Sequence, residues 1–583
     1  MIILGLNAFH ADSAAALVRD GLLVAAAEEE RFRREKHWAG LPTQAISYCL
    51  REAGLGLSDV DHIAVNQDSR ANLIRKIGYL LSHRPDPGLV LARLRNRQHR
   101  VGIAESLEKA FPGQSVRAPL HRIEHHLAHL SSAFHVSAFE EAITVSVDGF
   151  GDFSSAAWGL GTGSHLSAAR RVYFPHSLGV FYQALTQYLG FPHYGDEYKV
   201  MGLAPYGKAA HLDVMRKIVH LLPDGSFKLD LSYFRHHRAQ IAYQWNDGPP
   251  HFDDLFAPAL EDLLGPRRRP TDPLEDRHRD IACSVQAMYE EAFFHLIRSA
   301  QAQHGSTNLA LAGGCAMNSV ANGKVRRVTP VRRVYVQAAA GDAGGAIGAA
   351  FALWHQLGGK RMFQMDHAYW GPEFGHAEIA ELLSEHRPRL SQVGCTIEEM
   401  PDEPALCQHT AAAIAKGKVV GWFQGRMEWG PRSLGNRSIV CDPRRPDMKA
   451  ILNAKIKRRE SFRPFAPSVL EEAVSDWFEE DDAVPFMMQV FQIRKEKRQF
   501  IPAVTHVDGS GRLQTVSQRT NPLYHQLIAT FGEQTGIPML LNTSFNENEP
   551  VVCKPQEALD CYLRTEMDVL VLDKTMIIRN RNT

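Results

Sequence analysis

The fold can be worked out from the stretch TVSVDGFGD at residues 144–152. A short run rich in β-branched residues ends there in Asp148 and two glycines, and residues 156–160 are apolar again. This order predicts a strand, a polar turn and a second strand, with Asp148 presented at the mouth of a site. The glycines let a ligand approach the backbone closely, because they carry no Cβ atom.

The N-terminal residues repeat the same unit. Residues 2–6 are predicted to form a buried strand that runs into a polar turn. Two further strands, at 14–18 and 22–27, are joined by the Asp-Gly pair at 20–21, which is a strong hairpin signal. Two such units facing each other are typical of the duplicated nucleotide-binding core of actin, Hsp70 and the sugar kinases. Chance similarity between two hairpins explains these two stretches equally well.

The sequence EHHLAH lies just before residues 144–152. His125 and His129 are four residues apart, so on a helix both imidazoles lie on one face. With Asp148 they form a mixed nitrogen and oxygen donor set that suits a first-row divalent metal. Asp342 follows another predicted strand at a helix N-terminus, where it is either a capping residue or a fourth ligand. A lone HxxxH is more often a pair of ordinary helical histidines.

Length and composition limit the classes of protein to which this chain can belong. A chain of 583 residues is too long for one core, so two or more domains are expected. The 65 Lys and Arg residues balance the 65 Asp and Glu residues, so the chain has no net positive charge that would attract nucleic acid or a membrane surface. The eight cysteines form no CxxC pair, no basic leader starts the chain, and no uncharged apolar stretch reaches membrane-spanning length. We therefore expect a cytoplasmic protein with free thiols.

The middle of the chain contains a second candidate ligand site. The segment LALAGG at 309–314 predicts a buried strand that ends in a glycine pair, and Asn318 lies just beyond it. A strand, a glycine turn and a helix N-terminus together suit a nucleotide. Elsewhere, helices are predicted at 43–53, 177–189 and 280–303, a helical connection at 66–120, a polar loop at 195–207, and a cap or insertion at 208–279.

The character of the chain changes near residue 395. A predicted strand at 419–423 leads into a loop rich in Gly, Pro and Arg, and residues 455–463 hold five basic side chains opposed by one glutamate. A run of basic residues of this kind most often forms a solvent-exposed basic face. The interleaved Phe and Pro residues at 462–467 instead suit a rigid, partly buried surface, where Arg and Lys bind polyphosphate or acyl phosphate. A strand and polar loop at 538–546 are expected on the same pocket.

Taken together, the motifs resemble those of the NodU/CmcH family of O-carbamoyltransferases over nearly the whole chain. No single motif is specific, but the set is. Ser433 stands where alanine is common in that family, and residues 66–120 match weakly. The motifs are GLNAFH ending at His10, EERF at 29–32, HHLAH at 125–129, DGFGD at 148–152, EYKVMGLA at 197–204, GGCAMN at 313–318, GPR at 430–432 and FRPF at 462–465.

The resemblance implies an α/β protein of two domains. A TsaD-like domain of the actin-like (ASKHA) class is expected at 1–360, a linker at 361–394, and a YrdC-like α/β (α+β) domain at 395–583. The second domain is expected to make carbamoyl-adenylate from the co-substrates carbamoyl phosphate and Mg-ATP. The residues that match this site are Arg432, Lys457, Arg463, Arg512, Asn542 and Ser544.

The resemblance also implies that the first domain transfers the carbamoyl group at a metal. His125, His129, Asp148 and Asp342 match the ligands of an iron ion, with manganese or zinc as alternatives. His10 matches a residue beside the transferred group and is the candidate general base, and Lys36 is the candidate for orienting the intermediate. The residues that match the nucleotide part of this site are Gly313, Gly314 and Asn318.

Three functions compete at this point. The first is carbamoyl transfer to a hydroxyl of a small molecule, such as a saccharide or an antibiotic precursor, with no nucleic-acid or membrane partner and a homodimer left open. The second is carbamoyl or threonylcarbamoyl transfer to a protein or tRNA, for which the CxxC zinc fingers of the hydrogenase-maturation enzymes are missing. The third is a non-catalytic actin-like nucleotide-binding module, which does not need two histidines beside its nucleotide. We expect the first.

Overall fold

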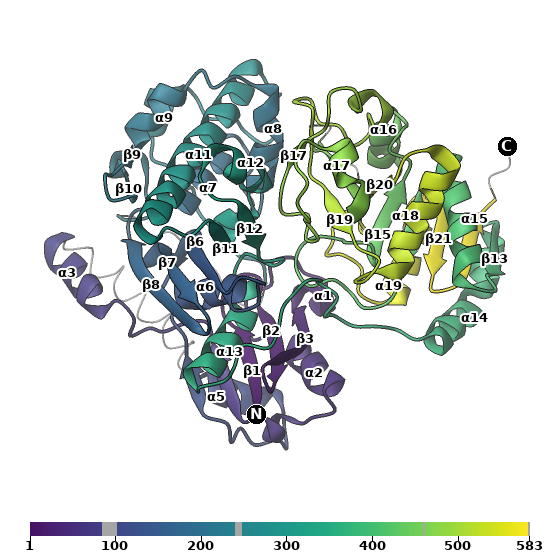
Figure 1. The fold of residues 1–583 in the computed structure, drawn as a ribbon, viewed down its shortest axis with the longest axis horizontal. Coiled ribbons are helices and arrows are strands. Elements are labelled where there is room, and N and C mark those ends of the chain that lie inside the picture. Colours follow the sequence, from purple (N-terminus) through teal and green to yellow (C-terminus); the bar gives the residue numbers. More distant parts are fainter. Residues whose placement is uncertain (84–101, 239–247, 458, 461, 581–583) are drawn as a thin grey trace. The chain divides into compact units, whose positions relative to one another are not determined.

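The protein divides into two compact units, Met1–Met365 and Asp366–Thr583. The structure is a computed structural model that describes residues 1–83, 102–238, 248–457, 459–460 and 462–580 (Figure 1). Among these residues, no helix combines the length and the apolar character that crossing a membrane requires.

The first unit begins with a five-stranded sheet in the order β3-β2-β1-β4-β5 (Figure 1, purple). Its strands are β1 (Ile2–Asn7), β2 (Ala14–Arg19), β3 (Leu22–Glu28), β4 (His62–Val65) and β5 (Leu120–Arg122). The first three form an antiparallel meander, and β4 and β5 run parallel to β1. Asp20 and Gly21 have φ values of 50° and 79°, as the predicted two-residue hairpin requires.

The second sheet of this unit has the same plan, in the order β8-β7-β6-β11-β12. Its strands are β6 (Glu141–Gly151), β7 (Ser154–Thr162), β8 (His165–Tyr173), β11 (Asn308–Ala312) and β12 (Arg333–Val336). Again three strands form an antiparallel meander and the last two run parallel to the first of them. The predicted duplication is confirmed, and with it an α/β fold of the actin-like class.

Two helices cross between the halves of the duplicated unit. The helix α6 (His125–Phe134) follows the first sheet but packs on β6 and β11 of the second, whereas α13 (Gly344–Gln356) follows the second sheet and packs on β1, β2 and β4. The two helices also pack on each other. A Cβ atom on Gly348 would lie 1.8 Å from the carbonyl oxygen of Ala128, so glycine is required for this approach. The crossing brings the start of α6 beside the turn before α13.

The other elements of the first unit include three confirmed helices and one correction. The helices predicted at 43–53, 177–189 and 280–303 correspond to α2, α7 and α11, and Ser177 is the N-cap of α7. The loop predicted at 195–207 is wrong, because α8 buries Val200 and Leu203 and packs against α11. These elements are α1 (Glu30–Arg33), α2 (Thr43–Glu52), α3 (Leu73–His83), α5 (Ile103–Ala110), α7 (Leu178–Tyr188), α8 (Glu197–Leu203), α9 (Leu212–Ile218), β9 (Val219–Leu221), β10 (Phe227–Leu229), α10 (Ala259–Leu264), α11 (Asp276–His304) and α12 (Ser319–Val328).

Two regions that the sequence left vague fall partly outside the described residues. The helical connection predicted at 66–120 contains α3 and α5 and ends in the edge strand β5, while residues 84–101 are not described. The cap or insertion predicted at 208–279 contains α9, β9, β10 and α10, and residues 239–247 are not described.

The second unit is built on a mixed eight-stranded sheet in the order β13-β22-β21-β14-β15-β20-β16-β19. The helices α15 and α18 pack on each other, and α19 packs on β14 and β21. The elements are α14 (His376–Gln392), β13 (Cys395–Glu399), α15 (Glu403–Ala415), β14 (Val420–Phe423), β15 (Arg437–Cys441), α16 (Met448–Leu452), β16 (Ala466–Leu470), α17 (Val474–Trp477), β17 (Phe491–Gln492), β18 (Ser510–Gly511), β19 (Gln514–Val516), α18 (Pro522–Thr535), β20 (Met539–Ser544), α19 (Pro555–Arg564), β21 (Val569–Leu572) and β22 (Thr575–Arg579).

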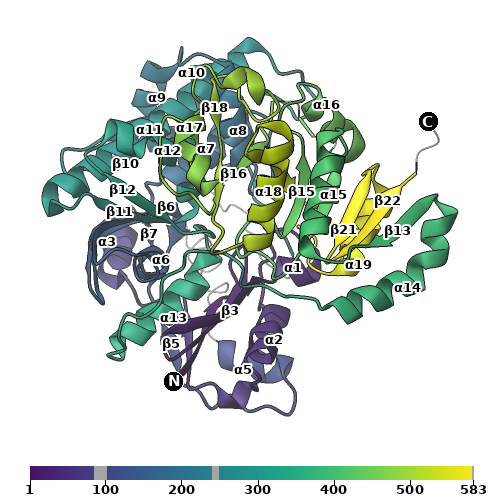
Figure 2. The ribbon, with the colours of Figure 1, turned by 45° about the vertical axis from the view of Figure 1, so that its right-hand side comes forward.

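The linker predicted at 361–394 is wrong over most of its length. The helix α14 packs against β13 (Figure 2) and buries Ile379, Leu383 and Leu390 in the core of the second unit. Arg361, by contrast, donates to carbonyl oxygens of the first unit, among them that of Ser137 at 2.6 Å. The boundary therefore falls between residues 365 and 366, because the apolar side of α14 belongs to the second core.

Candidate metal centre

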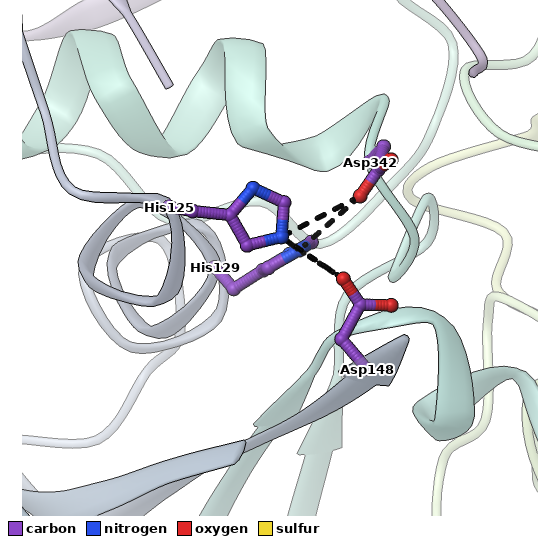
Figure 3. Close-up of side chains that lie close together, drawn as sticks. All are labelled: His125, His129, Asp148 and Asp342. Carbon is purple, nitrogen blue, oxygen red and sulfur yellow. Dashed lines mark hydrogen bonds and ion pairs between the residues drawn. The ribbon is translucent and has the colours of Figure 1, made fainter. Parts of the chain in front are cut away.

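Four side chains from three separate segments converge in the first unit (Figure 3). The Nε2 atom of His125 lies 2.9 Å from Oδ2 of Asp148, and Nε2 of His129 lies 3.4 Å from the same oxygen. Asp342, in the turn before α13, places Oδ1 3.5 Å from Nε2 of His129. One donor atom from each residue lies within 4.8 Å of the others. The structure thus brings together all four predicted ligands.

Asp148 is held at the end of β6 by its surroundings. The pairing of β6 with β7 is irregular just after Val147, as in a β-bulge, and this releases Asp148 from the ladder. The N–H of Gly314 donates to Oδ1 at 2.9 Å, and the hydroxyl of Ser177 donates to the main-chain oxygen at 3.0 Å. Gly313 has φ 89°, and a Cβ atom there would lie 2.3 Å from the oxygen of Val147. The glycine pair therefore orients a candidate ligand.

The chemistry of the four residues fits a divalent cation. When both imidazoles are neutral, as metal binding requires, the four side chains together carry two negative charges, and all four are largely buried. Oδ1 of Asp342 is buried and has no hydrogen-bond partner in the part of the chain that the structure describes. Burying such charge is costly unless a cation compensates it. A first-row metal bound by two histidines and two aspartates would do so.

The carboxylates shift the protonation of the histidines. Burial opposes the charged form of His125, but the hydrogen bond that its imidazole donates to Asp148 and the charge of Asp342 outweigh it and raise the pKa of His125 to about 9. The pKa of His129 is raised in the same way, against burial and the charge of His125. Burial and the charge of Asp148 raise the pKa of Asp342. A metal must displace these imidazole protons to bind.

The two candidate catalytic residues lie in different environments. His10 is 8% exposed, and its ring centroid lies 5.9 Å from that of His125, so it is brought to the centre. Lys36 is exposed after α1. The residue beside it, His37, has Nδ1 2.8 Å from Oδ1 of Asp12. The orienting role of Lys36 stays a prediction.

Asn318 has a structural task in this fold. Its Oδ1 atom accepts the N–H of Ala321 at 3.0 Å and so caps α12. Its amide nitrogen donates to Oε1 of Gln286 at 2.9 Å, and that residue donates back. The nucleotide contact predicted for Asn318 stays a prediction.

Two residues beside the centre were missed from the sequence. Asp152 accepts the backbone N–H groups of His125 and Asp68, and its signal was the second acid of the DGFGD motif. Tyr194 has a pKa well above its usual range because of burial, the charge of Asp12 and the carboxylates of the centre. A lone tyrosine in a polar loop gave no signal.

The second unit contains a cluster of like charges. Burial and the charges of Arg432 and Arg459 hold the pKa of Arg512 well below its usual range. The Nε atom of Arg512 is buried and has no hydrogen-bond partner among the described residues. Arg463, in contrast, forms an ion pair with Glu460. Guanidinium groups gathered in this way suit a multiply charged anion.

The other predicted residues of this unit hold its loops together. Lys457 is 2% exposed, and its ammonium donates to the main-chain oxygens of Ser544 and Asn546 at 2.6 and 2.7 Å. The amide of Asn542 donates to the main-chain oxygen of Ser433 at 3.0 Å. Lys457 and Ser544 are therefore together, and Asn542 lies beside the loop that carries the arginine at 432. Their contacts with substrate stay predictions.

Comparison with known proteins gives matches along most of the chain. A family model described as carbamoyltransferase N-terminus matches residues 2–351, and one described as carbamoyltransferase C-terminus matches residues 411–579. The chain is 41% identical to an uncharacterised protein of Synechocystis sp., over 99% of this chain and 96% of that protein. It is 39% identical to nodulation protein NolNO of Sinorhizobium fredii, over 98% and 79%. It is also 39% identical to nodulation protein NolO of Bradyrhizobium diazoefficiens, over 78% of each.

Solved structures give a weaker match. HypF of T. kodakarensis aligns over 61% of this chain and 48% of its own, with a TM-score of 0.30 and 14% identity. A ROK hexokinase from Thermus thermophilus aligns over 61% and 99%, with a TM-score of 0.29 and 13% identity. The actin-like class of the first unit rests on the matching strand orders and not on these scores.

Proposed function

Because this chain belongs to the carbamoyltransferase family, we propose that it carbamoylates a hydroxyl group in two steps, one in each unit. The observation that carries the proposal is the convergence of His125, His129, Asp148 and Asp342 on one buried point. A non-catalytic nucleotide-binding module would not need this donor set. The acceptor that we propose is a small molecule, such as a saccharide or another hydroxylated natural product.

The first step of the proposal takes place in the second unit, for which we keep the YrdC-like assignment. Carbamoyl phosphate, ATP and one water give carbamoyl-adenylate, phosphate and pyrophosphate. Arg512 and Arg432 would bind the phosphate groups and stabilise negative charge as it develops. Lys457 would act through the loop at 544–546, to which its ammonium is bonded.

The second step takes place at the metal centre of the first unit. A divalent metal, for which iron is our first choice, would act there as a Lewis acid on the carbamoyl group. The acceptor oxygen forms a bond to the carbamoyl carbon, the bond from that carbon to the adenylate oxygen breaks, and AMP leaves. His10 would take the hydroxyl proton, since its ring lies beside that of His125. Gly313 and Gly314, the second of which donates its N–H to Oδ1 of Asp148, would lie beside the adenylate.

The proposal can be tested with the purified full chain. Carbamoyl phosphate labelled with ¹⁴C is incubated with ATP, Fe²⁺ under anaerobic conditions and a panel of hydroxylated saccharides and natural products. We expect ATP-dependent release of pyrophosphate and label in a base-stable product with one acceptor class. Pyrophosphate release without any labelled product across the panel, or labelling of a protein or tRNA instead, would contradict a small-molecule acceptor.

A further inference from the structure

The N-terminal end of the metal-bearing helix α6 is held by a side chain that is not one of the four candidate ligands. Oδ2 of Asp152 accepts the backbone N–H of His125 at 2.9 Å. The same oxygen accepts the N–H of Asp68 at 2.7 Å, and the main-chain oxygen of Asp152 accepts the side-chain amide of Asn72 at 2.9 Å. One aspartate thus joins the start of α6 to the segment that follows β4.

This contact acts on a donor that the helix itself cannot satisfy. The first N–H groups of a helix have no partner within it. Glu124, the N-cap of α6, accepts the N–H of Leu127 at 2.8 Å and leaves that of His125 to Asp152. Because the N–H and the imidazole belong to the same residue, fixing the first restricts the direction of the second.

The ring of His125 is confined by the same turn. A Cβ atom on Gly151 would lie 2.0 Å from Cγ and Cδ2 of His125, so the imidazole lies directly on this glycine. Asp148 and Gly151 lie in the last residues of β6, and Asp152, with φ 47°, begins the turn that joins β6 to β7. The end of β6 and the turn after it therefore supply one carboxylate ligand, a surface on which the imidazole of His125 packs, and an acceptor for its backbone N–H.

We propose that Asp152 is a positioning residue for the metal: it binds the backbone of His125 to the end of β6, the strand that carries Asp148. The inference rests on the proposed metal function. Outer groups that orient metal ligands typically contribute 10- to 100-fold in metal affinity. Asp152 would act through the main chain of its ligand, whereas such groups more often contact the second ring nitrogen. Nδ1 of His125 has no hydrogen-bond partner within the described ranges, so the main-chain contact is the one available here.

The test uses Co²⁺ as the probe, titrated into the metal-free full chain against a competing chelator. We expect Asp152→Ala to weaken Co²⁺ binding by about 10- to 100-fold and to change the visible spectrum of the bound ion. Asp152→Asn should stay close to wild type, because its amide oxygen still accepts both N–H groups. Glu124→Ala is the matched control, since it removes a cap from the same helix end without freeing the N–H of His125.

Amide hydrogen exchange at His125 and Asp68 provides a readout that needs no metal. It should accelerate in Asp152→Ala and not in Asp152→Asn. Unchanged Co²⁺ affinity and exchange in Asp152→Ala would overturn the proposal, and so would an equal loss of affinity in Glu124→Ala, because fraying of the helix would then explain both. If Asp152→Ala does not fold, Asp152→Glu takes its place, since it moves the carboxylate and keeps its charge. If wild type binds no Co²⁺, the metal assignment fails, and exchange alone decides the positioning role.

Discussion

The Nε2 atoms of His125 and His129 lie 3.0 Å apart and face the carboxylates of Asp148 and Asp342. At this distance two unprotonated ring nitrogens would repel each other through their lone pairs. A proton or a metal ion bound between them removes that repulsion. Helical spacing supplies the two imidazoles, and the end of β6 and the turn before α13 supply the negative charge. The relationship explains why the centre binds protons strongly and why a divalent metal can replace them.

Removing one imidazole should separate the two half-reactions. His129→Ala should strip the metal and stop carbamoyl transfer, while pyrophosphate release in the second unit continues. Elemental analysis and a pyrophosphate assay measure the two effects. His121→Ala is the control, because His121 and His62 form an imidazole pair at 3.1 Å outside the centre. Full metal occupancy in His129→Ala would remove this residue from the ligand set.

Removing one guanidinium from the second unit should cost activity but not stability. Arg512 is buried next to the charges of Arg432 and Arg459, so Arg512→Ala relieves repulsion and should leave the melting temperature unchanged or higher. Pyrophosphate release from ATP and carbamoyl phosphate should fall by about 10²-fold or more, as expected when a group that stabilises developing charge is lost. Arg445→Ala serves as control, because Arg445 is an exposed partner of Asp447. Normal pyrophosphate release in Arg512→Ala would place the half-reaction elsewhere.

Substituting His10 by asparagine distinguishes a general-base role from a positioning role. An amide still donates and accepts hydrogen bonds but takes no proton near neutral pH. His10→Asn should therefore keep metal and adenylate synthesis and lose transfer by about 10²-fold or more, the typical contribution of a general base. Single-turnover transfer from preformed carbamoyl-adenylate measures this step. A rate near wild type would leave His10 with a positioning role only.

The pair formed by His37 and Asp12 should make stability depend on pH. Burial opposes the charged form of His37, but the charge and the hydrogen bond of Asp12 outweigh it and raise the pKa from 6.5 to about 9. The folded state therefore holds this proton more tightly than the unfolded state. The stabilisation is complete below pH 6.5 and is lost as the pH rises through 9. Between pH 6 and pH 9.5, the midpoint of urea unfolding should decrease more in wild type than in His37→Gln. Equal decreases in the two proteins would contradict a stabilising pair of His37 and Asp12.

The sequence predicted the core strands of the two duplicated halves better than the edge strand and the short helix that accompany them. Alternation, the Asp-Gly hairpin and the glycine turns located β1, β2, β3, β6, β7 and β11, because these signals are local. The edge strand β5 and the helix α8 were missed, since three residues carry no period and a short helix rich in polar and small residues looks like a loop. The helix α14 was taken for a linker, because only packing reveals which core receives Ile379 and Leu383.

What the sequence indicated by itself was a candidate donor set of two imidazoles four residues apart and Asp148 after a strand, with Asp342 open as a cap or a fourth ligand until the family resemblance added it. Spacing along one helix is a local property, so His125 and His129 could be paired before any fold was known. Only the tertiary structure decided that Asp148 and Asp342 face them, that Asp152 holds the backbone of His125, and that Lys457 is bonded to the loop at 544–546. Those contacts join residues far apart in the chain, and they exist because the crossed helices α6 and α13 and the sheets that they cover bring distant turns together.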